Sequence, residues 1–142
     1  MIERNKVTKG GYVVYEKDGH GLVVSPSDIG LLTWKNAKTA CDELILNGYS
    51  DWRLPSIKEL ELIYKNVYKA GIGNFARDVY WSSTEFSAYF AWYFCFFNGY
   101  ANDYDKGLTY RVRAVRTFFP ESETLQGQIS TETKTDVEKN KF

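Results

Sequence analysis

The chain has 142 residues, and its 18 Lys and Arg residues balance 18 Asp and Glu residues, so the formal net charge is zero. This length predicts one domain whose core needs neither a metal nor a disulfide, and the balanced charge excludes a strongly basic nucleic-acid-binding protein. Aromatic residues make up 17% of the chain, which is more than one small core usually requires.

The N-terminal part predicts a β-hairpin and no targeting segment. Residues 11–15 and 22–24 are β-branched and aromatic runs on either side of Asp18-Gly19, a strong turn signal, so we expect them to pair antiparallel. Residues 1–6 lack the basic and apolar regions of a signal peptide, and no apolar run approaches the length of about 18 residues that spans a bilayer. We therefore expect no signal peptide in this chain and no membrane span.

Two amphipathic helices are predicted after the hairpin. Apolar residues spaced by three and four predict a helix over 33–47, with Thr33 as its N-cap and Gly48 just past its end. Ser56 and Glu59 have the spacing of a capping box, which predicts the first turn of a second helix. We interpret both helices as scaffold.

From residue 80 onward the pattern changes to short strands and loops. Strands are predicted at 80–84, 91–97 and 110–118, with a turn at Asn98-Gly99 and a polar loop at 102–107. The expected fold class is therefore α+β, with two helices packed on a small twisted antiparallel sheet.

Residues 1–119 are interpreted as one domain and residues 120–142 as a tail. The tail begins at Pro120, is rich in Ser, Thr, Glu and Lys, and has one aromatic residue at its end. This composition is typical of a disordered segment or one that docks a partner. The partner would be a further copy of the chain or a virion component.

The aromatic excess is concentrated in the last strands, because 15 of the 24 aromatic residues lie between Tyr80 and Phe119. Both faces of segment 91–97 are apolar, which leaves two interpretations. Either this strand is covered on both sides, or one of its faces is an exposed aromatic patch that binds a ligand. Tyrosine mixed with Ser, Gly, Asn and Asp is typical of antibody loops.

Residues that usually carry catalysis or bind metals are too few to form a site. His20, expected to be exposed, is the single histidine, and Cys41 and Cys95 have no metal-ligand spacing, so both are expected to be free thiols. The oxygen side chains of loop 102–105 are fewer than the six to eight ligands that calcium takes. We predict no catalytic residue, no cofactor, no metal and no nucleic-acid partner.

Several charged residues are interpreted as architecture. Arg111, Arg113 and Arg116 either form an anion-binding strip or, as we favour, pair with acidic residues on neighbouring strands. Asp51 is expected to accept backbone amides or to pair with Arg53.

Five short motifs carry a family resemblance: residues 51–56 (Asp-Trp-Arg-Leu-Pro-Ser), 80–85, 91–92, 98–99 and 112–116. In this order and spacing they resemble the domain found at the C-terminus of bacterial collagen-like surface adhesins, over residues 10–118. That family is similar in fold to C-type lectins, so the resemblance implies a C-type-lectin-like fold. The residues interpreted as its scaffold are Asp51, Trp52, Arg53, Trp81, Trp92 and Arg113.

Residues 81–116 also resemble the variable region of C-type-lectin-fold proteins diversified by diversity-generating retroelements. There a reverse transcriptase mutates the adenines of a copied repeat, and the randomised Asn codons cannot yield Glu, Lys, Gln, Met or Trp. Residues 86–111 contain two residues of these types in 26 positions, Trp92 and Lys106, against 27 in the other 116 positions. These two residues are then interpreted as fixed framework positions.

The resemblance implies ligand-binding side chains at the positions that vary. The candidates are Phe86, Ser87, Tyr89, Phe90, Tyr93, Cys95, Phe97, Tyr100, Asn102, Asp103, Tyr104, Asp105, Gly107, Leu108 and Tyr110. The implied function is binding to a protein or glycan receptor on a target cell, from a virion or cell surface. The reverse transcriptase would act on the gene and would not be bound by the protein. Two alternatives remain open: an undiversified carbohydrate-binding adhesin module and a structural assembly module.

Overall fold

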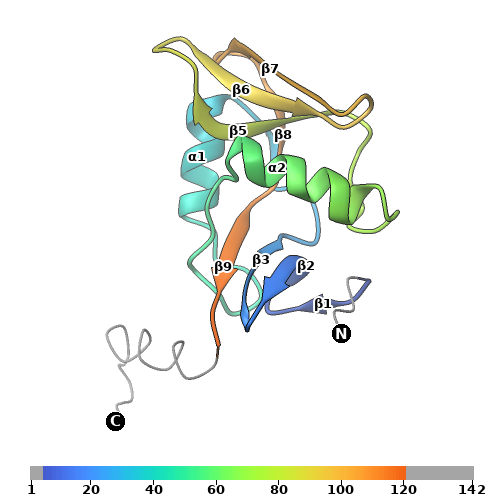
Figure 1. The fold of residues 1–142 in the computed structure, drawn as a ribbon. Helices are drawn as coiled ribbons and strands as arrows, with labels where there is room; N and C mark the ends of the chain where they lie inside the picture. The colour runs from blue at the N-terminus through green and yellow to red at the C-terminus, as the bar shows by residue number, and fades with distance from the viewer. Residues whose placement is uncertain (1–4, 121–142) are drawn as a thin grey trace.

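The computed structural model describes residues 5–120, which fold into two small sheets and two helices (Figure 1). A four-stranded antiparallel sheet has the order β1-β2-β3-β9. Its strands are β1 (Val7–Thr8), β2 (Gly11–Lys17), β3 (His20–Val24) and β9 (Val115–Phe118). The predicted hairpin is confirmed as β2 and β3, joined through Asp18 and Gly19, which both have positive φ angles.

The second sheet has five strands in the order β4-β8-β5-β6-β7. They are β4 (Gly30–Leu32), β8 (Tyr110–Val112), β5 (Val79–Glu85), β6 (Phe90–Cys95) and β7 (Tyr100–Asp105). Because β5 and β8 pair in parallel, this sheet is mixed rather than wholly antiparallel as predicted. In Figure 1, β6 and β7 lie at the end of the molecule opposite to the four-stranded sheet, from which both ends of the described chain emerge.

The two helices lie on opposite sides of β5. They are α1 (Trp34–Asp42) and α2 (Ile57–Ile63), and α2 continues as the π-helical segment η1 (Tyr64–Tyr68). Helix α1 ends at Asp42 and not at 47, because the backbone of Leu46 pairs with that of Tyr49 around a turn at Gly48. Thr33 occupies the N-cap position, but its side chain accepts no capping hydrogen bond.

The capping box predicted at the start of α2 is confirmed. The Ser56 hydroxyl accepts from the Glu59 backbone N–H, and the Glu59 carboxylate accepts from the Ser56 N–H at 2.9 Å. The same carboxylate receives two bonds from the Arg53 guanidinium at 2.7 Å. These hydrogen bonds fix the first turn of α2 against the segment that precedes the helix.

The Glu59 carboxyl makes the stability of the fold depend on pH. Burial raises the pKa of its carboxyl, but the bonds from Arg53 and Ser56 outweigh burial and hold the pKa below its ordinary value. A lowered pKa stabilises the fold above the pKa of the unfolded chain, and that stabilisation is lost as the pH falls through the folded pKa. Glu59→Gln should therefore lose less stability than the unmodified chain between pH 5 and about 3, as measured by urea unfolding at each pH. An identical acid dependence in both proteins would contradict this role of Glu59.

The core consists of two hydrophobic clusters that meet across β5. One contains Trp34, Ala37 and Cys41 of α1 with Trp81 and Ala91. The other contains Leu60, Ile63 and Val67 of α2 and η1. These pack with Tyr80 of β5, Phe94 of β6 and Phe96 just after β6. The central strands are therefore covered on both faces, which agrees with the first interpretation of segment 91–97 for its buried residues.

Two strand predictions are wrong in informative ways. Segment 102–107 is not a loop, since its first four residues belong to β7, which pairs with β6 in continuous register. Segment 110–118 is not one strand but two, β8 and β9, which belong to different sheets. The chain crosses between the sheets at Arg113 and Ala114, where Ser25 N–H bonds to the Ala114 carbonyl at 2.8 Å. A period-two pattern continues through such a crossing, so it gives no sign of the change of sheet.

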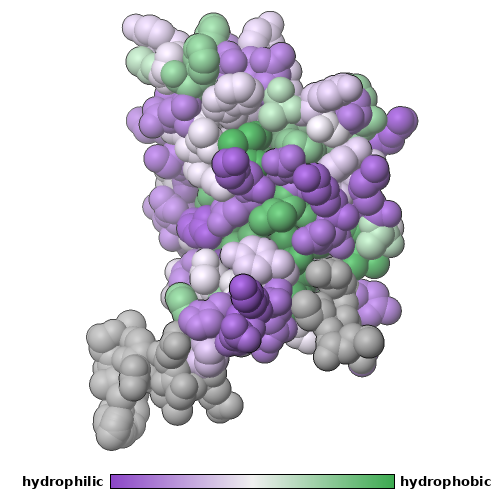
Figure 2. Space-filling model, in the orientation of Figure 1, coloured by the Kyte–Doolittle hydropathy of each residue, from purple (hydrophilic) through white to green (hydrophobic). Residues whose placement is uncertain are grey.

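The exterior of this domain is mixed in polarity. Figure 2 shows apolar residues, in green, interrupting the hydrophilic surface across the middle of the face that it presents. Within residues 5–120, no helix has both the length and the apolar character that crossing a bilayer requires. The tail predicted at 120–142 lies outside the described residues except for Pro120.

Candidate functional site

Tyrosine side chains gather on one face of the five-stranded sheet. The register of β6 and β7 sets Ala91 opposite Tyr104 and Tyr93 opposite Asn102, so these four side chains share a face. The ring of Tyr110, from β8, lies edge-on to that of Tyr93 with 5.4 Å between centroids. We call Tyr93, Asn102, Tyr104 and Tyr110 the tyrosine face.

The tyrosine face combines exposed and supported rings. Tyr104 is 51% exposed, whereas Tyr93 and Tyr110 are half-buried. Burial is the main cause that raises the pKa of Tyr93 and of Tyr110, and neighbouring tyrosines and carboxylates add to it. Both phenols therefore stay protonated at neutral pH and can donate as well as accept hydrogen bonds.

Trp81 supports this face from below. It is fully buried, its ring centroid lies 4.7 Å from that of Tyr110, and its indole N–H donates to the Leu32 carbonyl at 3.0 Å. The face thus rests on a rigid layer, which reduces the entropy lost when a ligand binds.

A pocket of about 300 Å³ lies on the other side of the β6–β7 hairpin, against the first turns of α2. It is lined by Ile57, Lys58, Glu61, Trp92, Phe94, Gly99, Tyr100 and Ala101. Trp92 is half-buried here, and its ring meets that of Phe86 edge-on at 6.2 Å. Gly99 has a φ of 78° in the hairpin turn, which confirms the turn predicted at Asn98-Gly99.

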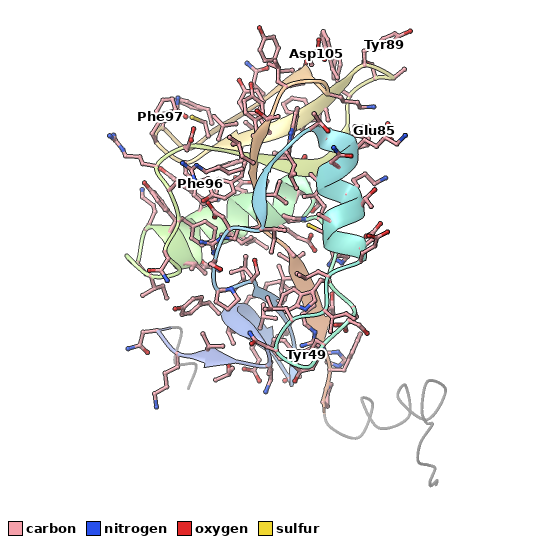
Figure 3. The ribbon with its side chains drawn as sticks, turned by 180° about the vertical axis from the view of Figure 1, so that it is seen from behind. Tyr49, Glu85, Tyr89, Phe96, Phe97 and Asp105 are labelled. Atoms are coloured by element: carbon pink, nitrogen blue, oxygen red, sulfur yellow. The ribbon has the colours of Figure 1, made fainter. Side chains whose placement is uncertain are left out.

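The turn between β5 and β6 carries exposed aromatic residues and is held by one lysine. Phe86 is 59% exposed and Tyr89 is 77% exposed. The Lys106 ammonium donates to Glu85 at 2.8 Å and to the carbonyls of Ser87 and Ala88, and it lies 4.3 Å from the Trp34 ring centre. Figure 3 shows Glu85, Tyr89 and Asp105 at one end of the molecule, far from Tyr49.

Lys106 makes a titration test of this arrangement possible. Its hydrogen bond to Glu85 is the main cause that lowers the pKa of that carboxyl. In Lys106→Met, the Glu85 carboxyl should titrate at a higher pH, and the amides of Ser87 and Ala88 should exchange faster with solvent. NMR titration and hydrogen exchange measure both effects, with Lys35→Met on the exposed side of α1 as the control. An unchanged Glu85 titration would contradict the ion pair.

The three arginines do not form an anion-binding strip, because each is paired. Arg113 Nε lies 2.7 Å from Asp28, Arg111 pairs with Asp28 and Asp78, and the Arg116 side chain pairs with Asp51 at 2.6 Å. The favoured pairing with acidic residues is therefore correct. Its predicted location is wrong, since the acidic partners lie outside the strands and not on neighbouring strands.

Asp51 was expected to accept backbone amides or to pair with Arg53, but its carboxylate pairs with Arg116 instead. Arg116 is nearly buried and takes both oxygens of Asp51, at 2.6 and 3.2 Å. Arg53 turns instead to Glu59, and its backbone pairs with Val115. Trp52 is buried, as its interpretation as scaffold requires.

Most of the predicted ligand-binding positions reach the surface. Eleven are exposed: Phe86, Ser87, Tyr89, Phe90, Phe97, Tyr100, Asn102, Tyr104, Asp105, Gly107 and Leu108. Tyr93, Asp103 and Tyr110 are half-buried. Cys95 is 5% exposed, so its thiol is part of the interior and cannot contact a large ligand. Asp28, the partner of two arginines, was missed because no local pattern marks a loop carboxylate as the partner of arginines far along the chain.

The cysteines and carboxylates form no reactive centre in the described residues. Cys41 and Cys95 are both buried free thiols, as predicted, and burial raises the pKa of Cys41 to about 12. Between residues 5 and 120, no group of three or more His, Cys, Asp or Glu side chains is placed to hold a metal ion. His20 is exposed, as expected.

Comparisons with known proteins place this architecture in a family. The chain is similar to the solved structure described as "EMS16, an Antagonist of collagen receptor integrin alpha2beta1 (GPIa/IIa)", with a TM-score of 0.47 and 13% identity over 80% of this chain and 99% of that one. No curated protein matches the sequence. The family model described as the Lcl C-terminal domain matches residues 13–116, in agreement with the resemblance that the sequence motifs indicate. Since this match covers well over half of the chain, the protein belongs to the Lcl C-terminal domain family.

Proposed function

We propose that this protein is a non-enzymatic ligand-binding module of the adhesin type, and that the tyrosine face with the adjoining β5–β6 turn is its binding surface. The observation that carries the proposal is the concentration of exposed rings. Six exposed aromatic residues and one exposed leucine lie within 86–108: Phe86, Tyr89, Phe90, Phe97, Tyr100, Tyr104 and Leu108. Of these, Phe86, Tyr89 and Tyr104 lie on the proposed surface itself. Exposed aromatic patches on a stable scaffold are typical of recognition surfaces.

The position of the surface supports this function. It lies at the end of the molecule opposite to the sheet from which the described chain enters and leaves (Figure 1). A module attached through either end therefore presents the tyrosine face outward. The proposed setting is a virion or cell surface, with a protein or glycan receptor on a target cell.

A catalytic role has little support in the residues. Cys41 is buried with a raised pKa, so its thiol stays protonated and is a poor nucleophile. The lone histidine, His20, lies on β3 in the other sheet. The five-stranded sheet therefore offers contact area and hydrogen bonds, with no imidazole and no accessible thiol among its described residues.

Diversification by a retroelement is the finer part of the proposal. It is supported by the exposure of 11 of the 15 candidate positions and by the burial or half-burial of Trp81, Trp92 and Arg113. The test is genomic: a near-identical template repeat beside a reverse transcriptase gene, with differences confined to template adenines. A gene without such a repeat would remove diversification and leave the binding proposal intact.

An undiversified glycan-binding module is the alternative that a specific observation favours. Trp92 lines a pocket together with Lys58 and Glu61, and an aromatic ring beside charged groups suits the mixed polarity of a sugar. Binding to a glycan array should then persist from about 0.15 M to about 1 M salt, since exposed charges contribute little to ring stacking. An array without a binder at either salt concentration would count against this alternative.

A further inference from the structure

The edge of β7 is the longest free strand edge in the part of the chain that the structure describes. In the five-stranded sheet, β7 pairs with β6 alone over six consecutive residues. The edge strands β1 and β4 have two and three residues, and β9 is covered at Val115 by the backbone of Arg53. A free edge of this length presents a row of backbone groups for another strand to pair with.

β7 lacks most of the features by which proteins protect such edges. Residues 100–105 contain no Pro and no Lys, and the pairing with β6 shows no shift in register. Lys106 N–H donates to the Tyr89 carbonyl, and because an antiparallel ladder alternates, the backbone groups of Ala101 and Asp103 turn away from β6. The Asp103 N–H agrees with this geometry, since it bonds to the Asn102 side chain and not to β6.

The two faces of β7 differ in chemistry. Asp103 and Asp105 share one face, opposite Trp92 and Phe90 of β6. Neither carboxylate forms an ion pair with any residue from 5 to 120. The other face carries Asn102 and Tyr104 of the tyrosine face. A strand added here would therefore place alternate side chains beside carboxylates and beside tyrosine rings.

We propose that the β7 edge binds an extended peptide by strand addition, and that the peptide alternates basic side chains with apolar or aromatic ones. Basic residues would lie beside Asp103 and Asp105, and the pocket next to Ala101 would take the aliphatic stem of one of them against Trp92. This inference rests in part on the proposed function, because β7 contributes to the tyrosine face.

The charge of the edge favours this occupant over a second copy of the chain. Pairing two β7 strands would bring together four carboxylates, from Asp103 and Asp105 of each copy, with no basic residue in either strand to offset them. Like charges that face each other across strands are destabilising. A basic strand neutralises the same carboxylates, and backbone bonds supply affinity while the alternation supplies specificity.

The test uses the full chain and the synthetic peptide Lys-Val-Lys-Tyr-Lys-Val-Lys, labelled for fluorescence polarisation. Binding should weaken about tenfold or more with Asp103→Asn/Asp105→Asn, and likewise with Ala101→Pro, which removes an outward N–H at an exposed position. A peptide N-methylated on alternate amides and an acidic Glu-for-Lys peptide should not bind. The control Asp42→Asn, an exposed carboxylate on α1, should bind as the unmodified chain does.

Three outcomes would overturn the proposal. The first is equal binding of the peptide by the unmodified chain and by both β7 variants. The second is no binding even at millimolar peptide. The third is a concentration-dependent dimer that Ala101→Pro abolishes, because that result would assign the edge to a second copy of the chain. The Asp103→Asn/Asp105→Asn variant changes no residue of the tyrosine face and none that lines the pocket beside Trp92. A receptor or glycan that still binds this variant therefore separates failure of strand addition from failure of the proposed function.

Discussion

Replacing Arg113 with alanine is expected to lower the free energy of unfolding by about 3–5 kcal/mol, because it leaves buried polar groups without their partner. The side chain is fully buried. Its guanidinium donates to Asp28 at 2.7 Å and to the carbonyls of Ser25, Gly73 and Asn74 at 2.7 to 2.8 Å, and it lies 3.8 Å from the ring centre of Phe75. One residue thus holds together two loops and the crossing between the two sheets.

Urea unfolding measures this effect, and Arg77→Ala is the matched control. Arg77 is exposed, so its substitution should change the stability by no more than about 0.5 kcal/mol. Arg113→Lys should recover little, since an ammonium cannot supply the fork of donors that this site uses. A loss below about 1 kcal/mol in Arg113→Ala would contradict the assigned role.

Trp81→Ala is the second large expected effect, with a loss of about 3–5 kcal/mol from a cavity beneath the tyrosine face. Trp81 is fully buried and also donates its indole N–H to Leu32. Removing it takes the support from Tyr110 and, through that ring, from Tyr93. Trp81→Phe should lose less stability than Trp81→Ala, because phenylalanine retains most of the packing and only the indole hydrogen bond to Leu32 is lost outright.

Thermal unfolding and NMR spectra of the tyrosine rings measure the two consequences of Trp81→Ala. Tyr89→Ala serves as the control, since Tyr89 is 77% exposed and its loss should leave the midpoint unchanged. A destabilised Trp81→Ala protein with unshifted Tyr93 and Tyr110 resonances would contradict the support that we assign to this indole.

The parts of the fold that local patterns determine were predictable. The capping box at Ser56 and the Asp18-Gly19 turn depend on residues a few positions apart, and both are confirmed. The end of α1 was not predictable in this way, because its apolar spacing continues through residues that form a bridge instead. Likewise, β7 is polar and exposed, so its sequence is that of a loop, and its pairing with β6 makes it a strand.

The candidate site, too, was predictable only where composition or a local pattern indicated it. Composition located the exposed rings in the last strands. The register that sets Tyr93 opposite Asn102 and Tyr104 opposite Ala91 was not predictable, because it depends on the pairing of β6 with a segment expected to be a loop. Alternation included Cys95, which is buried because this end of β6 is covered. Asp28 lies 85 residues before Arg113, and a contact at that separation leaves no trace in one sequence.

Binding by variants of the tyrosine face tests the central claim most directly. The unmodified protein, Tyr93→Phe/Tyr104→Ala and the control Tyr15→Ala, which removes a 40% exposed ring from β2, would be compared on a glycan array and on whole bacterial cells. The account predicts that every target bound by the unmodified protein is bound about 30-fold more weakly by the double variant and equally by the control. Targets retained by the double variant and lost by Tyr15→Ala would contradict it and move the binding surface to the other sheet.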